Sequence, residues 1–287
     1  MLERRTVTAK VSILGLALAV FASACSGAAA PSSAPGSSSS GSVASSGSVA
    51  SPATGATTFA PATSATLEFG DNAQTVLVGD NGRRIFIDVY FPDGLPKPAL
   101  GPNDILLTTH RHDDHYLPDF VNAFPGPTLT DKAGTLKFAD VTITGLEASH
   151  DEGAMGSDHI FVIDFAGLRI VHFGDIGQTV LTADQLAAIG PGRVDVAISQ
   201  TYNVYSSMDS SNNKGVKLMQ QVEPKIFIPT HHDGDTITYA AKLWPTTYST
   251  KPITLKKSMI PDKTTMLIMG QDAEYFATLL KLKPAGW

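Results

Sequence analysis

The most constraining feature of this 287-residue chain is one short run of metal-binding residue types, His110-Arg111-His112-Asp113-Asp114-His115. In an extended segment, His110 and His112 point the same way, because side chains alternate along a strand. Asp114 and His115 add a second pair of ligands directly after them. Because a metal site of this kind needs further groups from other loops, the run requires a fold that brings several loops to one place.

Further ligand types follow short apolar runs later in the chain. The residues in this position are His150, Asp175, His231 and His232. Loops at the ends of strands often carry function. A single histidine after a strand is more often a hydrogen-bonded structural residue than a ligand. The shared position of these residues, rather than any one of them, favours a metal site.

The order and spacing of these residues resemble the metallo-β-lactamase superfamily of metal-dependent hydrolases, from about Thr66 to about Gly270. The chain is most similar to the ascorbate-phosphate lactonase-like branch, which is near the N-acyl-phosphatidylethanolamine phospholipase D type. Four segments carry that similarity: Phe86-Ile87-Asp88, Asp104 to Thr109, Gly174-Asp175-Ile176-Gly177, and Ile228-Pro229-Thr230-His231.

The resemblance implies an α/β fold, the αββα four-layer sandwich, with two divalent metal ions. It implies that one metal is held by His110, His112 and His150, and the other by Asp114, His115 and His231. Asp175 would bridge the two metals, and Asp114 and Asp175 would be the catalytic carboxylates. Histidine and carboxylate ligands suit Zn²⁺ best, and also Mn²⁺ or Fe²⁺. A metal-bound hydroxide, available near neutral pH, would then cleave a small ester, lactone or phosphodiester.

Two features of the composition exclude other activities. Superfamily members that destroy antibiotics often carry a cysteine at the position of Asp175, but the only cysteine here is Cys25, so a true β-lactamase is not expected. Residues 1–25 hold three basic residues and one acidic residue, so the remainder has 18 basic and 26 acidic residues, a net charge of −8. Because phosphate contacts depend on Lys and Arg, we expect a small-molecule substrate and no nucleic-acid partner.

Residues 1–25 resemble a bacterial lipoprotein signal peptide. Arg4, Arg5 and Lys10 precede an apolar stretch over residues 11–21, which is short for a membrane span. Cys25 follows a small-residue triplet, so we expect it to be lipidated and to anchor the exported protein to a membrane, in the periplasm or at the cell surface. Ala22 departs from the lipoprotein pattern, in which Leu is more usual, and ordinary signal cleavage is the alternative.

Residues 26–65 are almost entirely Ser, Gly, Ala, Pro and Thr, with no charge. Such a segment cannot bury enough apolar surface to offset its ordering entropy, so it is predicted to be a disordered tether. Residues 66–287 are predicted to form the hydrolase domain, which is long enough for one core. A single cysteine excludes an intrachain disulfide, so that core must stabilise the fold alone.

The pattern of apolar residues predicts strands before helices, which fits two packed sheets with helices outside them. Asp80-Asn81-Gly82 predicts a hairpin turn, and Thr182 with Gln185 predicts a capped helix that stops at Gly190-Pro191. A second helix is predicted over 213–222. The predicted strands cover residues 67–69, 75–78, 84–89, 105–109, 135–138, 141–144, 160–165, 168–173, 194–198, 226–228 and 266–269.

The substrate is the least constrained part of this interpretation. Tyr202 and Asn203 follow a predicted strand and are candidates for orienting a substrate oxygen, although a solvated loop explains them equally well. Two other functions stay open: a metal- or ligand-binding lipoprotein without turnover, and a phospholipase-like enzyme acting on membrane lipids. A deep apolar groove beside the metals would favour the phospholipase.

Overall fold

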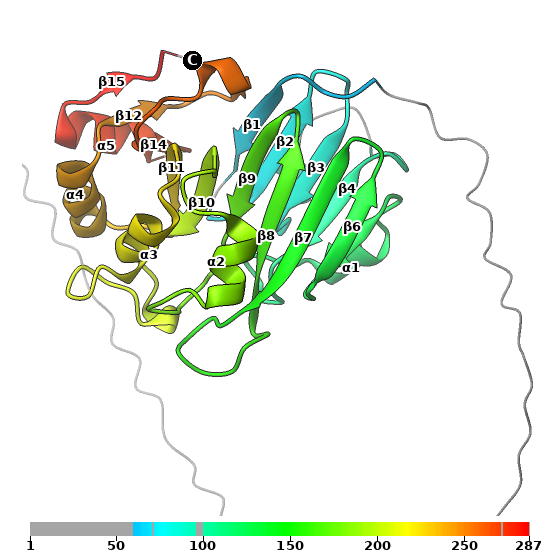
Figure 1. Ribbon diagram of the computed structural model, residues 1–287, viewed down its shortest axis with the longest axis horizontal. Coiled ribbons are helices and arrows are strands. Elements are labelled where there is room, and N and C mark those ends of the chain that lie inside the picture. Colours follow the sequence, from blue (N-terminus) through cyan, green and yellow to red (C-terminus); the bar gives the residue numbers. More distant parts are fainter. Residues whose placement is uncertain (1–59, 71, 96–99, 271, 287) are drawn as a thin grey trace, which may run out of the picture. The chain divides into compact units, whose positions relative to one another are not determined.

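The computed structural model describes residues 60–70, 72–95, 100–270 and 272–286, which form two β-sheets with helices on their outer faces (Figure 1). The first sheet has six strands in the order β13-β1-β2-β3-β4-β5. Strands β1, β2 and β3 are antiparallel, whereas β3, β4 and β5 are parallel. Their bounds are β1 Ala65–Phe69, β2 Thr75–Gly79, β3 Arg84–Ile87, β4 Ile105–Thr108, β5 Thr128–Thr130 and β13 Ile253–Leu255.

The second sheet has nine strands in the order β15-β12-β14-β11-β10-β9-β8-β7-β6. Strands β6 to β9 form an antiparallel meander. The remaining neighbours, β9-β10-β11-β14-β12-β15, pair in parallel. The bounds are β6 Gly134–Phe138, β7 Val141–Ala148, β8 Asp158–Phe165, β9 Leu168–His172, β10 Val196–Gln200, β11 Ile226–Thr230, β12 Thr246–Ser249, β14 Thr265–Met269 and β15 Lys283–Pro284.

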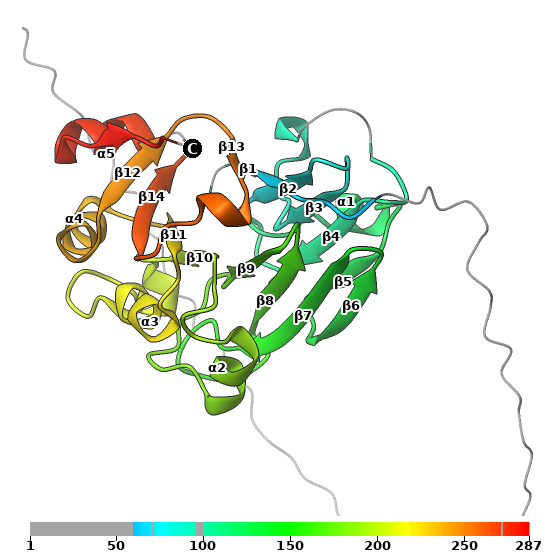
Figure 2. The same ribbon diagram turned by 45° about the horizontal axis from the view of Figure 1, so that its top comes forward.

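Three apolar clusters hold the layers together. The first lies between the sheets and includes Ile85 and Ile105 from one sheet and Ile163 and Ile170 from the other. The second joins the nine-stranded sheet to α2–α5, and the third joins the six-stranded sheet to α1 (Figure 2). The predicted αββα sandwich is therefore confirmed. The helices are α1 Pro118–Asn122, α2 Ala183–Ile189, α3 Lys214–Val222, α4 Gly234–Leu243 and α5 Ala273–Leu280, with short 3-10 turns η1 Pro92–Gly94, η2 Val204–Ser206 and η3 Lys257–Met259.

Local signals in the sequence account for several element boundaries. Thr182 caps α2, its side chain accepting from the backbone of Gln185 while the Gln185 side chain accepts from the backbone of Thr182. The helix ends at Gly190, whose φ of 72° is the left-handed conformation that glycine adopts without strain. Both the cap and the stop were predicted.

Other elements differ from the prediction. Strand β7 runs to Ala148, four residues beyond its predicted end, because its partner β8 pairs with it along its length. Helices α1, α4 and α5 were not predicted, and neither were β5, β12, β13 and β15. These elements are short or lie among mixed polar residues, so their stability comes from packing on the sheets rather than from local pattern.

The described structure begins within the segment predicted to be a tether, over residues 60–65. Ala62 and Ala65 are buried, and β1 begins at Ala65. The reason is that the side chain of Asp80 accepts hydrogen bonds from the backbone and the hydroxyl of Thr63, which fixes this segment against the β2–β3 turn. The predicted signal peptide, Cys25 and most of the predicted tether lie outside the described residues. None of the described helices is long and apolar enough to span a membrane.

Candidate metal centre

Chain direction brings the site together at one edge of the sandwich. Strands β4, β7, β9, β10 and β11 all end there, since β7 and β9 are each antiparallel to β8 and β9–β11 are parallel. The loops after these strands carry all the predicted metal ligands and both predicted substrate residues. The residues placed in this way are His110, His112, Asp114 and His115 after β4, His150 after β7, Asp175 after β9, Tyr202 and Asn203 after β10, and His231 after β11.

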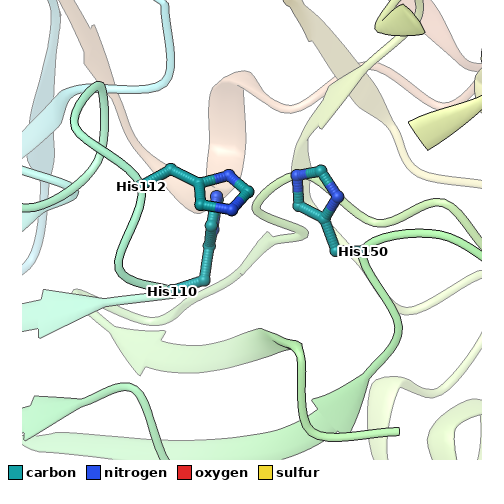
Figure 3. Close-up of side chains that lie close together, drawn as sticks. All are labelled: His110, His112 and His150. Carbon is teal, nitrogen blue, oxygen red and sulfur yellow. The ribbon is translucent and has the colours of Figure 1, made fainter. Parts of the chain in front are cut away.

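Three histidines form the first cluster, which we call cluster A. His110, His112 and His150 each offer a ring nitrogen, and these nitrogens lie within 4.8 Å of one another. Figure 3 shows the three rings converging, two from the loop after β4 and one from the loop after β7. His110 and His150 are buried and His112 is exposed, so cluster A opens to solvent on one side.

Two carboxylates and two histidines form the second cluster, cluster B. Asp114, His115, Asp175 and His231 each offer one ligand atom, again within 4.8 Å of one another. The Nε2 atom of His115 lies 3.2 Å from Asp175 Oδ1 and 3.3 Å from His231 Nε2. Asp114 Oδ2 lies 3.8 Å from the Nε2 atoms of both histidines.

Asp175 connects the two clusters. Its Oδ1 atom lies 3.2 Å from His231 Nε2 in cluster B, and its Oδ2 atom lies 3.7 Å from His150 Nε2 in cluster A. The grouping of the seven side chains agrees with the two ligand sets that the resemblance implied, with Asp175 between them. Their roles as ligands stay predictions.

The donor atoms of this site suit a bound metal. Among the described residues, His110 Nε2, His150 Nε2 and Asp175 Oδ1 are buried side-chain atoms without a hydrogen-bond partner. A buried polar atom left unpaired costs about 1–3 kcal/mol, and structures retain one mainly where something else satisfies it. A divalent cation coordinated by imidazole nitrogens and carboxylate oxygens would satisfy all three.

The electrostatics of the clusters are dominated by burial and by Asp175. Burial, reinforced by neighbouring His115, lowers the pKa of His110 to about 4, so this ring is neutral and ready to accept a cation. Burial also lowers the pKa of His115, but Asp88 and Asp175 outweigh it and raise that pKa well above 6.5. Because a ligating histidine must be neutral, metal binding in cluster B would displace a proton from His115.

Asp88 contacts the ring nitrogen of His115 that does not face cluster B. This carboxylate is fully buried after β3, accepting from the backbone N–H and the hydroxyl of Thr109 at 2.7 and 2.8 Å. Its Oδ2 also lies 2.9 Å from His115 Nδ1. A carboxylate on one ring nitrogen fixes the tautomer in which the other nitrogen is free to ligate. Asp88 was noted in the sequence only as part of the resemblance, without this role.

Asp158 was missed by the sequence analysis. It is fully buried at the start of β8, with Oδ1 3.3 Å from His110 Nδ1. Burial and then the nearby Asp175 raise the pKa of Asp158 well above 3.8. Because β8 is antiparallel to its neighbours, its first residue lies at the edge where they end. A search of strand ends alone could not have found it.

Backbone conformation lets the loops approach one another. Gly174 has φ of 55°, and a Cβ there would lie 2.4 Å from Asp158 Oδ1, so only glycine allows the turn that presents Asp175. His231 has φ of 35°, a conformation that costs a non-glycine residue about 1–2 kcal/mol. The backbone N–H of Tyr202 donates to the His231 carbonyl at 2.6 Å and holds it there. Strain of this kind is typical of functional positions.

Two other histidines near the site lie outside both clusters. His172 Nδ1 accepts a hydrogen bond from the backbone N–H of Gly174, and its Nε2 lies 3.1 Å from the carbonyl oxygen of Ala73, which makes it a structural residue. His232 is a candidate ligand by sequence, but it joins neither ligand group. Its ring packs edge-on against that of Phe276, with the two ring centroids 5.0 Å apart.

The predicted substrate residues lie at the site with different surroundings. The Asn203 side-chain amide donates to Asp175 Oδ2 at 2.7 Å and its oxygen accepts from the backbone N–H of Tyr205. Asn203 therefore positions a predicted ligand, a role that the sequence did not indicate. Tyr202 lines the cavity in front of the clusters.

That cavity has a volume of about 840 Å³. Ligand atoms of both clusters face it, including His112, Asp114, His150, Asp175 and His231. A space of this size admits a small organic molecule and not a folded partner. The arrangement can therefore present a substrate to two adjacent cation sites at once.

Comparisons with known proteins agree with the fold. Residues 69–231, which contain all seven predicted ligands, match the model of the β-lactamase superfamily domain. A Zn-dependent hydrolase of the metallo-β-lactamase superfamily from Thermotoga maritima is 23% identical, with 72% of this chain and 98% of that chain covered and a TM-score of 0.53. A metal-dependent hydrolase from Parabacteroides distasonis is 21% identical, covering 70% and 92%, with a TM-score of 0.48. The comparison with curated proteins gives no match.

Proposed function

This chain belongs to the β-lactamase superfamily and is a metal-dependent hydrolase, and we propose that it uses two divalent metal ions to cleave a small ester, lactone or phosphodiester. The observation that carries this proposal is the pair of ligand groups joined by Asp175, each with its ligand atoms within 4.8 Å. Two metals side by side can act on both the attacking and the leaving oxygen of one displacement.

The donor set divides naturally between the two ions. His110, His112 and His150 would hold the first, and Asp114, His115 and His231 the second, with Asp175 between them. Five histidines among seven ligands favour Zn²⁺, and Mn²⁺ or Fe²⁺ also accept such ligands. When bound, the metals would supply an acidified water at neutral pH and positive charge opposite a developing oxyanion.

The chain itself supplies orientation and proton transfer. Asp88 and Asn203 fix His115 and Asp175, so these two ligands are held before substrate arrives. The Asp114 carboxylate is 41% exposed and faces the cavity, where its oxygen can accept a proton from the attacking water. An aspartate at position 175 in place of a cysteine is the reason that we propose an activity other than that of a β-lactamase.

We also propose a cellular setting and a place within the superfamily. The segments around Asp88, Asp175 and His231 support the ascorbate-phosphate lactonase-like branch. The N-terminal pattern supports export and a lipid anchor on Cys25, so the enzyme would work outside the cytoplasm at a membrane surface. Metabolic labelling with a fatty acid tests the anchor: incorporation should be lost on Cys25→Ser, and labelling of the variant would contradict it.

The metal content of the full chain, purified without chelator, tests the central proposal. Elemental mass spectrometry should find close to two metals per chain, with fewer in His110→Ala and in Asp175→Ala. A folded protein that takes up no Zn²⁺ or Mn²⁺ would refute the proposal. Metal binding without turnover of any ester, lactone or phosphodiester would instead identify a binding protein.

A further inference from the structure

Part of the cavity in front of the metal clusters is apolar. Its lining includes five apolar or aromatic side chains, Phe69, Tyr202, Val204, Tyr205 and Met269, which we call the apolar lining. Phe69 and Met269 lie at the ends of β1 and β14, and the other three follow β10. A substrate that reaches the clusters therefore also contacts apolar surface.

The tip of η2 is the most exposed part of this lining. Val204 and Tyr205 are 62% and 82% exposed. Exposed apolar side chains grouped at a cavity often mark a binding surface. A substrate that covered them would gain hydrophobic free energy in proportion to the area buried.

The η2 tip is tied firmly to the metal centre. Asn203, just before it, bonds both Asp175 and the backbone of Tyr205. The Ser206 hydroxyl donates to the Asp175 carbonyl at 3.1 Å, and Lys214 Nζ donates to the Ser206 carbonyl at 3.3 Å. The tip therefore has a fixed position relative to a predicted ligand, which a specificity surface requires.

The charged side chains that line the cavity disfavour an anionic substrate. Among the described residues that line it, Arg111 is the only Lys or Arg, and its guanidinium pairs with Asp131 at 2.8 Å. Asp113 and Asp272 line the same cavity in addition to the predicted ligands Asp114 and Asp175. A substrate with an anionic group beyond its reacting centre would meet carboxylates there, and the basic side chain of Arg111 is already paired.

We propose that the substrate is an uncharged ester or lactone with an apolar acyl or alkoxy arm, and that Val204 and Tyr205 bind this arm. The proposal rests on the hydrolase function proposed above and narrows its substrate class. Water adds its oxygen to the acyl carbon, the bond from that carbon to the alkoxy oxygen breaks, the alkoxy oxygen takes one proton, and the acid product releases the other. The phosphorylated lactone in the name of the branch that the chain resembles would be disfavoured.

A series of p-nitrophenyl esters tests the apolar arm on the full chain reconstituted with Zn²⁺. From acetate to butyrate to octanoate, kcat/KM should rise on the order of 10-fold or more, since each buried methylene contributes about threefold to fourfold. Val204→Ser should remove most of this rise by increasing KM for octanoate, and Tyr205→Ala should do the same. Val180→Ser is the matched control, because Val180 is 64% exposed but does not line the cavity, and it should keep the rise.

Bis(p-nitrophenyl) phosphate tests the reacting group. Ester rates independent of chain length, an equal effect of Val180→Ser, or faster cleavage of the phosphodiester than of the esters would each overturn this inference while leaving a metal-dependent hydrolase. Absence of all hydrolysis in a protein that binds its metals would refute the proposed function instead. Thermal unfolding of each variant establishes that it is folded before its rates are compared.

Discussion

Replacing Asp88 with asparagine tests whether this buried carboxylate prepares His115 for a metal. Asp88 accepts three hydrogen bonds: two from Thr109 and one from His115. Asparagine has nearly the same shape, but it turns one acceptor into a donor. In one orientation its N–H₂ group faces the Thr109 N–H, and in the other it faces His115 Nδ1.

Both orientations weaken the metal site. Facing Thr109, the amide loses one buried hydrogen bond, which costs about 1–3 kcal/mol of stability. Facing His115, it favours the ring tautomer with the proton on Nε2, the nitrogen that lies 3.2 Å from Asp175. Either way the negative charge that raises the pKa of His115 is gone, so the ring attracts a cation less. Loss of such a partner weakens metal affinity by about 10- to 100-fold, or about 1.4–2.7 kcal/mol.

The assay is a Zn²⁺ titration of the metal-free protein in competition with a coloured chelator, with urea unfolding measured in parallel. Asp104→Asn is the matched control, because Asp104 is also buried and charge-paired, with Arg84, but precedes β4 at the end away from His110. The control should lower stability and leave metal affinity unchanged. Equal Zn²⁺ affinity in wild type and Asp88→Asn would refute the role assigned to Asp88.

Three further predictions concern single side chains. Asn203→Ala should lower kcat/KM for any substrate by about 10- to 100-fold, because Asp175 loses its donor; unchanged steady-state kinetics would contradict this. Hydrogen bonds from Thr63 lower the pKa of Asp80 from 3.8 to about 2, so its stabilisation is present above pH 4 and is lost as pH falls through 2. Asp80→Asn should therefore be less stable than wild type at pH 7 but equally stable near pH 2 in urea unfolding. Thr182→Ala should cost about 1 kcal/mol in the same assay, and no loss would show that α2 does not depend on its cap.

The grouping of the predicted ligands in space could be predicted because most of its information is local. His110 to His115 lie in one loop, and His150, Asp175 and His231 each follow an apolar strand whose pattern marks its end. Loops after strands that run in the same direction reach the same edge, which favours one shared site, and the resemblance to the superfamily implied how these residues divide into two groups. The order of strands and helices predicted two packed sheets with helices outside them, and the resemblance implied the αββα sandwich.

The helices after the last ligands were not predicted because their residues suggested something else. Asp233 and Asp235 lie beside His231, where an aspartate can also serve as the partner that orients a ligating histidine. In the structure Asp233 caps α4 instead, its carboxylate accepting from the backbone and the hydroxyl of Thr236. An aspartate near a metal motif and an aspartate at a helix start have the same local sequence. Only the packing of α4 on the nine-stranded sheet decides between them.

The contacts that Asp158 and Asn203 make with predicted ligands could not be predicted for a different reason. Each acts through a predicted ligand, Asp158 beside His110 and Asn203 on Asp175, across 48 and 28 residues of chain. Such contacts depend on strand pairing, since Asp158 reaches the site only because β8 runs against its neighbours. The pattern of residues along the sequence does not give the direction of a strand relative to its neighbours in the sheet.

The buried carboxylates link the stability of this fold to its function. Asp88, Asp158 and Asp175 are at most 2% exposed, and the ion pairs they make are with His115, His110 and other histidines. Burying a carboxylate is costly unless positive charge lies beside it. Protonated His115, whose pKa Asp88 and Asp175 raise well above 6.5, supplies part of that charge, and cations held by the same rings would supply it in its place. Metal binding would therefore compensate carboxylates that are buried in the interior of the sandwich, so we expect bound ions to stabilise the fold as well as to serve the proposed reaction.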